Sequence, residues 1–314
     1  MKSNNNDLPL VSVGIPTYNR PDGLRRTLEC ITRQTYKNLE IIVSDNASET
    51  DEVEVIAKEY IEKDPRVQYF KQEINKGAAV NFQFVLDKAT GDYFMWAADD
   101  DEWDLSYIRS CLEAFKKSRD IILVGTMCKV VNSETGDFYM IDEGFTTVGL
   151  RPRERFVKYK SVIHSGKHIG AIFHGLYKRA SLNSVMPLRN VIACDHIMMA
   201  DLCFQGEILT VQEPLMVKRY GGASVSIENI AIVLGITNRF VIMFPYLKRE
   251  ILLQKIIFQT KKFTLIDKIK LSIWSFCNYL LLELKLTRNK ILTILPTWIK
   301  QAIKCFCATW QQAF

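Results

Sequence analysis

The sequence predicts an α/β fold in which helices cover a mostly parallel sheet, with a helical extension at the C-terminus. One reason is that short apolar segments with strand character alternate with amphipathic helical segments in the first half of the chain. Another is that polar residues recur where three predicted strands end, at 17–19, 45–46 and 99–101. Because parallel strands end at the same edge of a sheet, these residues are expected to share one site.

The elements follow in a regular order. Strands are predicted at residues 10–15, 39–43, 67–70, 93–97 and 121–131. Helices are predicted from about 22 to 31, from about 51 to 62 and after the turn at 75–77, because apolar residues recur there at helical spacing. A hairpin is then expected near 132–140, a helix at 195–204, a strand at 209–217 and a flexible loop at Gly221-Gly222. We expect residues 1–225 to form the catalytic domain and residues 226–314 a separate helical region.

The most informative segment is an apolar run that ends in four consecutive acids, residues 99–102. Clustered carboxylates repel one another and resist desolvation, so they are expected where the strand leaves the sheet. Carboxylate oxygens suit Mg²⁺ or Mn²⁺, which usually share their coordination with substrate phosphates. An acidic turn before a helix capped by Asp104 or Ser106 would explain the same residues. The motifs described below favour a metal site at Asp100 and Asp101.

Composition argues against several other classes of protein. The eight cysteines form no CxxC pair, which speaks against a disulfide scaffold or a zinc site and fits reduced thiols. The segment Gly14-Ile15-Pro16-Thr17 lacks the Gly-x-Gly-x-x-Gly loop of dinucleotide-binding oxidoreductases. Nucleic acid is not an expected partner, because four acids at a strand end repel phosphates unless a metal intervenes. Residues 1–9 are polar, without an apolar signal core, so a cytoplasmic location is expected.

The C-terminal region is predicted to consist of basic amphipathic helices. Residues 248–304 hold 12 Lys and Arg against three acids, although the whole chain has a net charge of only +6. The longest uncharged apolar-rich run, 271–282, is shorter than the roughly 20 residues that span a bilayer. Apolar residues share one helical face, and tryptophans lie nearby: Leu265, Ile269, Ile273, Phe276 and Leu280, with Trp274, Trp298 and Trp310. Such helices either lie in a membrane interface or pack on the catalytic domain with a solvated basic face. We expect peripheral contact with the inner face of the cell membrane.

Four motifs in a fixed order resemble the family 2 glycosyltransferases, which are nucleotide-sugar-dependent enzymes of GT-A fold. They are Val11-Ser12-Val13-Gly14-Ile15-Pro16-Thr17-Tyr18-Asn19-Arg20, Asp45-Asn46-Ala47-Ser48, Asn75-Lys76-Gly77-Ala78-Ala79-Val80-Asn81, and Gly91-Asp92-Tyr93 with Asp99-Asp100-Asp101. The resemblance covers roughly residues 10 to 220. A single acidic triplet would be far less specific than this ordered set.

The resemblance implies a role for each matching residue on the nucleotide side. The turn after the first strand would contact the nucleotide, Asp45 the base edge, and Asp99 the ribose or nucleotide side. Asp100 and Asp101 would hold the metal that bridges the diphosphate. The full set of expected nucleotide-sugar-binding residues is Pro16, Thr17, Tyr18, Asn19, Asp45, Asn75, Lys76, Asp99 and Arg219. Arg219 is included because arginine matches phosphate oxygens bidentately, although a connector between domains would explain that segment as well.

On the acceptor side the resemblance implies that Asp195 is the catalytic base. The family pattern is Glu-Asp with a glycine eleven residues after the Asp, which is Gly206 here. The chain departs from this pattern at Cys194 and Asp201, and from the metal motif at Ala98. A helix N-cap would explain Asp195 as well. Of the histidines at 164, 168, 174 and 196, only His196 lies beside the proposed base, and the others are expected to be structural.

These residue types predict one reaction. An acceptor hydroxyl attacks the anomeric carbon opposite the leaving diphosphate and inverts its configuration, and a carboxylate removes the hydroxyl proton. The expected function is transfer of a sugar from a nucleoside-diphosphate sugar to a saccharide or lipid-linked acceptor, in surface polysaccharide or lipopolysaccharide biosynthesis. The alternative is a catalytically inactive protein with the same fold, or a protein that only binds membrane surfaces.

Overall fold

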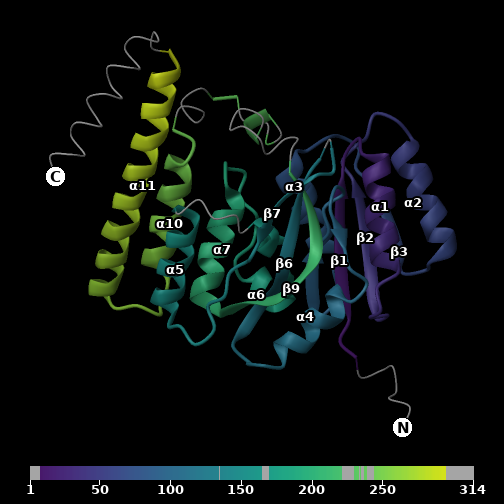
Figure 1. Ribbon diagram of the computed structural model, residues 1–314, viewed down its shortest axis with the longest axis horizontal. Coiled ribbons are helices and arrows are strands. Elements are labelled where there is room, and N and C mark those ends of the chain that lie inside the picture. The colour runs from purple at the N-terminus through teal and green to yellow at the C-terminus, as the bar shows by residue number, and fades with distance from the viewer. Residues whose placement is uncertain are drawn as a thin grey trace.

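The computed structural model of the protein describes residues 8–133, 135–164, 170–220, 230–232, 234, 237–238 and 244–294. One mixed sheet forms its centre, and helices cover both faces (Figure 1). The predicted Gly221-Gly222 loop, His168, Trp298 and Trp310 lie outside the described residues.

The predicted alternation of strands and helices is confirmed. The strands are β1 (Val11–Thr17), β2 (Leu39–Asp45), β3 (Val67–Lys71), β4 (Tyr93–Trp96), β5 (Glu102–Trp103), β6 (Ile121–Asn132), β7 (Phe138–Asp142), β8 (Leu176–Lys178) and β9 (Glu207–Tyr220). The helices are α1 (Pro21–Thr32), α2 (Glu52–Lys63), α3 (Ala78–Lys88), α4 (Tyr107–Phe115), α5 (Pro152–His164), α6 (Arg179–Asn183), α7 (Cys194–Gln205), α10 (Leu247–Gln259) and α11 (Leu265–Ile294), with a 3₁₀ turn at Gly170–His174.

The strand order explains where a ligand can bind. It runs β3-β2-β1-β4-β8-β6-β9-β5, with β7 paired to β6. The β1–β2, β2–β3, β1–β4 and β6–β9 pairs are parallel, so the half of the sheet formed by β3, β2, β1 and β4 is parallel as predicted. The β4–β8, β6–β8, β6–β7 and β5–β9 pairs are antiparallel and make the sheet as a whole mixed. The chain passes from β1 to β2 on one side and returns to β4 on the other, which makes the carboxyl ends of β1 and β4 the switch point where such sheets bind ligands. The short strands β5 and β8 were not predicted, because two or three residues carry no periodic signal.

Side chains of successive strand residues pack on opposite faces of the sheet. On one face Val13 and Ile15 pack with Leu24 and Leu28 of α1. On the other, Phe94 and Trp96 of β4 belong to a larger core that includes residues of α3, α5 and α7. This alternation follows from the two-residue period of a strand. The apolar side chains of the strands thus fill the two faces of the sheet, and the polar residues at the strand ends lie at one edge.

Helices α10 and α11 pack against α7 and α5, which lie between them and the sheet (Figure 1). Leu253, Ile257 and Leu271 are buried there with Phe156 and Phe204 of α5 and α7. The opposite side of α11 is apolar yet exposed; Ile273, for example, is 61% exposed. The interpretation that these helices pack on the rest of the protein is therefore confirmed for one face of α11, and contact with a membrane stays a prediction. In the part of the chain that the structure describes, no helix combines the length and the apolar character needed to cross a membrane.

Candidate functional site

The ends of β1 and β4 are joined by a buried hydrogen bond. Thr17 Oγ1, at the end of β1, donates to Asp99 Oδ2 over 2.7 Å. Thr17 and Asp99 are 2% and 6% exposed, so this bond lies beneath the surface of the switch point. It brings together two residues that the sequence placed in separate motifs.

Arg20, at the start of α1, forms ion pairs with the same acidic loop. Its Nη1 atom lies 3.1 Å from Asp99 Oδ1 and 2.7 Å from Asp100 Oδ2. Gly23, in the first turn of α1, allows the acidic loop to approach the helix, because a Cβ atom there would lie 2.0 Å from the Asp99 carbonyl oxygen. Arg20 was not among the predicted site residues, although it is the last residue of the first motif.

The three aspartates have different surroundings. The strand ends before them, as predicted, but only Asp100 is exposed, with 41% of its side chain accessible. Burial raises the pKa of Asp99 to about 6, although Arg20 and Thr17 act in the opposite direction. Burial also raises the pKa of Asp101 to about 7, against the nearby Lys218 ammonium. The structure therefore holds two carboxyls that ionise less readily than usual, which a binding cation would reverse.

Only one of the two carboxylate oxygens of Asp101 accepts a hydrogen bond from the described residues. Its Oδ1 atom accepts a hydrogen bond from the Arg219 backbone N over 3.2 Å, and Lys218 Nζ lies 3.9 Å from Oδ2. Within the described residues Oδ2 has no hydrogen-bond partner. The Arg219 guanidinium pairs with Glu102, so the side chain predicted to bind phosphate makes a protein contact in this structure.

The residues predicted to hold the metal fit one in chemistry. Mg²⁺ and Mn²⁺ prefer oxygen ligands, and Mg²⁺ in particular is often held by one or two carboxylates plus substrate phosphates. Asp100 supplies an exposed carboxylate, and Asp101 supplies a buried oxygen without a hydrogen-bond partner. No cluster of three or more His, Cys, Asp or Glu side chains suited to a metal occurs within the described ranges. The protein thus offers part of a coordination shell, and a diphosphate would have to supply more.

Asp45 organises the loop after β2. It is fully buried; its Oδ1 atom accepts a hydrogen bond from Ser48 N over 2.8 Å, and its Oδ2 atom accepts one from Tyr69 OH over 2.9 Å. Burial raises the pKa of the Tyr69 phenol, and the Asp45 charge contributes. A nucleotide base can reach Asp45 only through the lone pairs that these two bonds leave.

The remaining nucleotide-side residues form a connected rim around this loop. Asn46 donates to Asn75 Oδ1 over 2.8 Å and accepts from Lys76 N over 3.1 Å, which fixes the turn before α3. Asn19 has a positive φ of 54° and exchanges hydrogen bonds with Ser48 and Glu49. Of the predicted residues, Thr17 is the register partner of Asp45 and Asn19 lies on the same loop edge. Asn46 and Ser48, which the prediction left out, hold them in place through hydrogen bonds to Thr17 O and Asn19 N.

Asp195 lies in the first turn of α7 with 42% of its side chain exposed. The N-cap is Ala193, at φ 58°, and no side-chain cap bond is present, so the helix-cap explanation of Asp195 is wrong. His196 Nε2 lies 3.9 Å from Asp195 Oδ2. Burial, with a contribution from the Asp195 charge, raises the pKa of Tyr177, whose ring packs against Trp96 at the end of β4.

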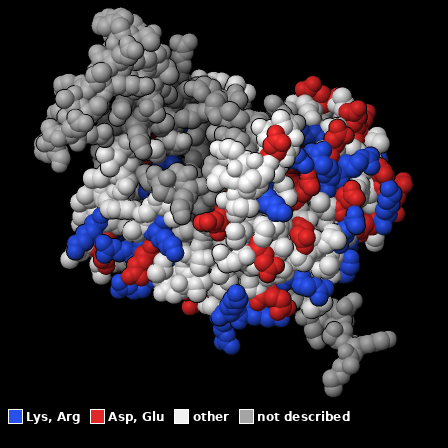
Figure 2. All heavy atoms as spheres, viewed as in Figure 1, with Lys and Arg blue, Asp and Glu red and all other residues white. Residues whose placement is uncertain are grey.

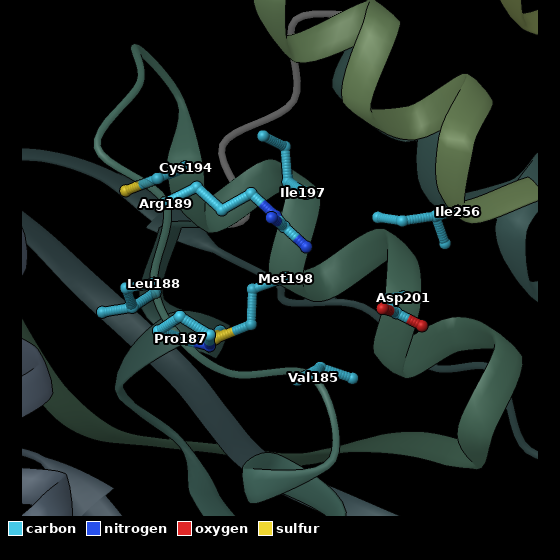
Figure 3. A pocket seen from close by; sticks show the side chains of 9 residues that line it. All are labelled: Val185, Pro187, Leu188, Arg189, Cys194, Ile197, Met198, Asp201 and Ile256. Atoms are coloured by element: carbon cyan, nitrogen blue, oxygen red, sulfur yellow. The ribbon is translucent and has the colours of Figure 1, made fainter. Parts of the chain in front are cut away.

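The two departures from the family pattern on α7 have distinct surroundings. Burial raises the pKa of the Cys194 thiol to about 12, so it stays neutral and does not replace a carboxylate. Cys194 and Asp201 line a small pocket between α7 and residues 185–189, with Ile256 of α10 on its far side (Figure 3). Arg189 points into the same pocket, and its charge opposes the effect of burial, which raises the pKa of Asp201.

His174 confirms the expectation of a structural histidine. It is buried and lies 3.3 Å from the Trp96 carbonyl through Nδ1, and burial holds its pKa well below the usual range. Lys218 and Arg249 also belong to the site but were not predicted. No local motif marks them, because each reaches the site only through the packing of a distant element.

Comparison with known proteins identifies the family. The model of "Glycosyl transferase family 2" matches residues 12–185, more than half of the chain. A GalNAc(5)-diNAcBac-PP-undecaprenol beta-1,3-glucosyltransferase of Campylobacter jejuni is 36% identical over 96 residues, which cover 30% of this chain and 31% of that protein. The chain spans less than half the length of the first curated relatives it matches.

Solved structures show the same fold at low sequence identity. Staphylococcus aureus TarS, in complex with UDP-GlcNAc, superposes with a TM-score of 0.61 at 16% identity, covering 86% of this chain and 72% of that one. The mannosyltransferase PcManGT from Pyrobaculum calidifontis, in complex with GDP-Man and Mn²⁺, gives a TM-score of 0.52 at 16% identity, covering 96% and 80%. The ordered motifs, the switch-point site and these matches establish that the chain belongs to glycosyl transferase family 2 and has a GT-A fold.

Proposed function

We propose that the protein is an inverting glycosyltransferase that moves a sugar from a nucleoside-diphosphate sugar to a hydroxyl acceptor. The observation that carries this proposal is the Thr17–Asp99–Arg20 cluster, which joins the ends of β1 and β4 at the ligand-binding edge of the sheet. The expected setting is surface polysaccharide or lipopolysaccharide synthesis. The family membership and the glucosyltransferase relative support it.

The donor would occupy the edge formed by the loops after β1, β2 and β4. Asp45 and the rim around Asn46 would receive the base, and Asp99 the ribose. The proposed contacts are Pro16, Thr17, Tyr18, Asn19, Asp45, Asn75, Lys76, Asp99 and Arg219. Arg219 would have to leave Glu102 to meet a phosphate, and an incoming diphosphate is a stronger partner for a guanidinium than one exposed carboxylate.

Asp100 and Asp101 would hold Mg²⁺ or Mn²⁺. When bound, the ion would neutralise the charge that grows on the diphosphate as it leaves. The Asp101 Oδ2 atom, which accepts no hydrogen bond among the described residues, and the exposed Asp100 carboxylate support this role. Asp100 would then turn to the cation, and Arg20 would pair with Asp99 alone.

Asp195 would remove the proton from the acceptor hydroxyl. It is exposed enough to meet a substrate, it does not cap its helix, and His196 supports it from one side. Ala98 and Cys194 replace two acids of the family pattern, so a catalytically inactive protein remains the second candidate. The observation in its favour is the neutral, half-buried Cys194 thiol.

We further propose that the α10–α11 pair contacts an anionic membrane surface and so brings the enzyme to a lipid-linked acceptor. The outward side of α11 exposes large apolar residues: Leu265, Ile266, Ile269, Ile273, Phe276, Leu280 and Leu281. Exposed lysines border it, and Figure 2 shows Lys and Arg side chains around the lower end of this helix pair. Basic amphipathic helices of this kind bind anionic interfaces. The proposal places the enzyme at the inner face of the membrane, and the division of the chain near residue 225 stays a prediction.

The proposal is tested by turnover of a panel of UDP-, GDP- and dTDP-sugars with Mn²⁺. We expect nucleotide release from one donor class, loss of that release in excess EDTA, and its loss in Asp100→Ala. The matched control is Asp87→Ala, which removes an exposed carboxylate from the surface of α3. Full activity in EDTA or in Asp100→Ala would refute the metal role, and absence of turnover with every donor would favour the inactive alternative.

A further inference from the structure

A buried polar network connects the C-terminal helices to the proposed base. Lys160 of α5 and Glu250 of α10 form an ion pair at 3.1 Å, with side chains 3% and 1% exposed. Glu250 also accepts a hydrogen bond from Ser275 of α11 over 2.6 Å. These bonds fix the position of α10 against both neighbouring helices. Arg249, the next residue along α10, is therefore held at a defined place.

Arg249 faces α7 from this position. It is 2% exposed, its guanidinium lies 4.4 Å from the centre of the Tyr246 ring, and its Nη1 atom lies 3.3 Å from His196 Nδ1. A guanidinium can only donate, so His196 Nδ1 must be the acceptor. The imidazole then carries its proton on Nε2, which is the atom 3.9 Å from Asp195 Oδ2.

The ring of His196 is restrained from a second direction. Tyr159 of α5, itself buried, meets it edge to face with ring centres 6.5 Å apart. With Nδ1 engaged by Arg249 and the ring plane set by Tyr159, the Nε2–H group is aimed at the Asp195 carboxylate. A water molecule or a small rotation of either side chain would bridge the 3.9 Å between them.

Ordinary helix packing does not account for Arg249. Burying a guanidinium is costly, and burial indeed lowers the pKa of Arg249. Within the described residues no carboxylate forms an ion pair with it, and the adjacent Glu250 pairs with Lys160. Its Nε and Nη2 atoms lack hydrogen-bond partners among the same residues. Asp195 is one of the groups whose charge stabilises its cationic form.

We propose that Arg249 is a positioning residue for Asp195: through His196 it fixes the imidazole tautomer that supports the carboxylate facing the acceptor. The proposal rests on the proposed function of Asp195 as the base. It gives the C-terminal helices a part in the acceptor side of the site, beyond the residues that the family model covers.

The first test observes the imidazole directly. Nitrogen NMR of the full chain, with the His196 signal assigned from His196→Ala, should show Nδ1 unprotonated and Nε2 protonated. In Arg249→Met the signals should move toward a mixture of the two tautomers. The control is Lys248→Met, which removes an exposed cation from the same helix. An unchanged His196 spectrum in Arg249→Met would overturn the proposal.

The second test is kinetic. Arg249→Met should lower kcat about 10- to 100-fold, because small misplacements of a catalytic group cost that much. The KM for the donor and the calorimetric affinity for the nucleoside diphosphate should stay within about twofold of wild type, which general loss of structure would not allow. In a His196→Ala background, Arg249→Met should have little further effect, because the two residues act in series.

The outcomes separate this proposal from the proposed function. An active wild-type enzyme whose kcat is unaffected by Arg249→Met would overturn the positioning role alone. Full additivity of Arg249→Met and His196→Ala would do the same, since Arg249 would then act by another route. A wild-type protein without turnover on any donor would instead refute the proposed function, and the positioning role with it.

Discussion

The nucleotide side and the acceptor side of this protein are built in different ways. On the nucleotide side, Thr17, Asp45 and Asp99 follow neighbouring strands and are fixed by buried hydrogen bonds within about 90 residues of chain. On the acceptor side, Asp195, Tyr159 and Arg249 come from three helices, α7, α5 and α10, over a comparable length of chain. A parallel sheet places the ends of its strands at one edge, whereas helices meet only through their packed faces.

This contrast has a consequence for mutations. Changes on the nucleotide side should affect affinity and loop order together, because the same carboxylates organise the loops. Changes on the acceptor side should affect the rate with little effect on donor binding. The following predictions test this division, from the largest expected effect to the smallest.

Asp195→Asn should give the largest effect. Loss of a general base typically costs about 10²- to 10⁴-fold, so kcat should fall within this range. Calorimetry should show nucleoside diphosphate affinity close to wild type. Asp201→Asn, on the same helix and in the pocket of Figure 3, is the matched control and should retain most activity. A large loss of nucleotide affinity in Asp195→Asn would remove the distinction between the two sides.

Asp45→Ala should have the opposite pattern. It removes the acceptor for Ser48 N and Tyr69 OH, so the loop after β2 loses its order. We expect nucleotide affinity to fall by about 10- to 100-fold and stability by about 1–3 kcal/mol, the usual cost of unpaired buried groups. Tyr69→Phe, which removes only one of these bonds, should be milder in both measurements. Wild-type affinity in Asp45→Ala would exclude Asp45 from the nucleotide site.

Contact of α10–α11 with lipid should produce an intermediate effect. Replacing Lys255 and Lys270 by Gln should weaken binding to anionic liposomes about 30-fold in a flotation assay at low salt, since each basic residue near the surface contributes roughly 1 kcal/mol. High salt should weaken wild-type binding in the same way. The same change at Lys37 and Lys58, two other exposed lysines, should have little effect. If wild-type protein ignores anionic liposomes at low salt, this helix pair does not bind membranes.

The smallest effect concerns pH. In metal-free protein Asp99 and Asp101 have pKa values of about 6 and about 7, above the ordinary value for Asp. The folded state therefore binds more protons than the unfolded state between about pH 4 and 7, and these two groups make stability fall as pH rises through that window. Asp101→Asn should raise Tm by a few degrees at pH 7.5, and the gain should shrink toward pH 4. An equal gain at both pH values would show that Asp101 does not titrate in this window.

Much of the nucleotide side was predictable. The predicted strands are apolar segments that stop abruptly at polar residues. These polar residues proved to be neighbours in the structure, as Thr17 and Asp99 show. Burial was less predictable: the acids were expected to leave the sheet together, yet Asp99 and Asp101 are buried and only Asp100 is exposed. Which member of an acidic run turns inward depends on partners such as Arg20 and Arg219, and these approach from other elements.

The sequence by itself determined the order of strands and helices, the identity of the acidic edge and the family. These features depend on local periodicity and on motifs whose residues lie close together in the chain. Tertiary structure alone decided that β8 separates β4 from β6, that one face of α11 packs while the other stays exposed, and that Arg249 reaches His196. The physical reason is that helix packing joins residues far apart in sequence through contacts of shape and charge. A single amphipathic period records that a face is apolar, but not which surface will cover it.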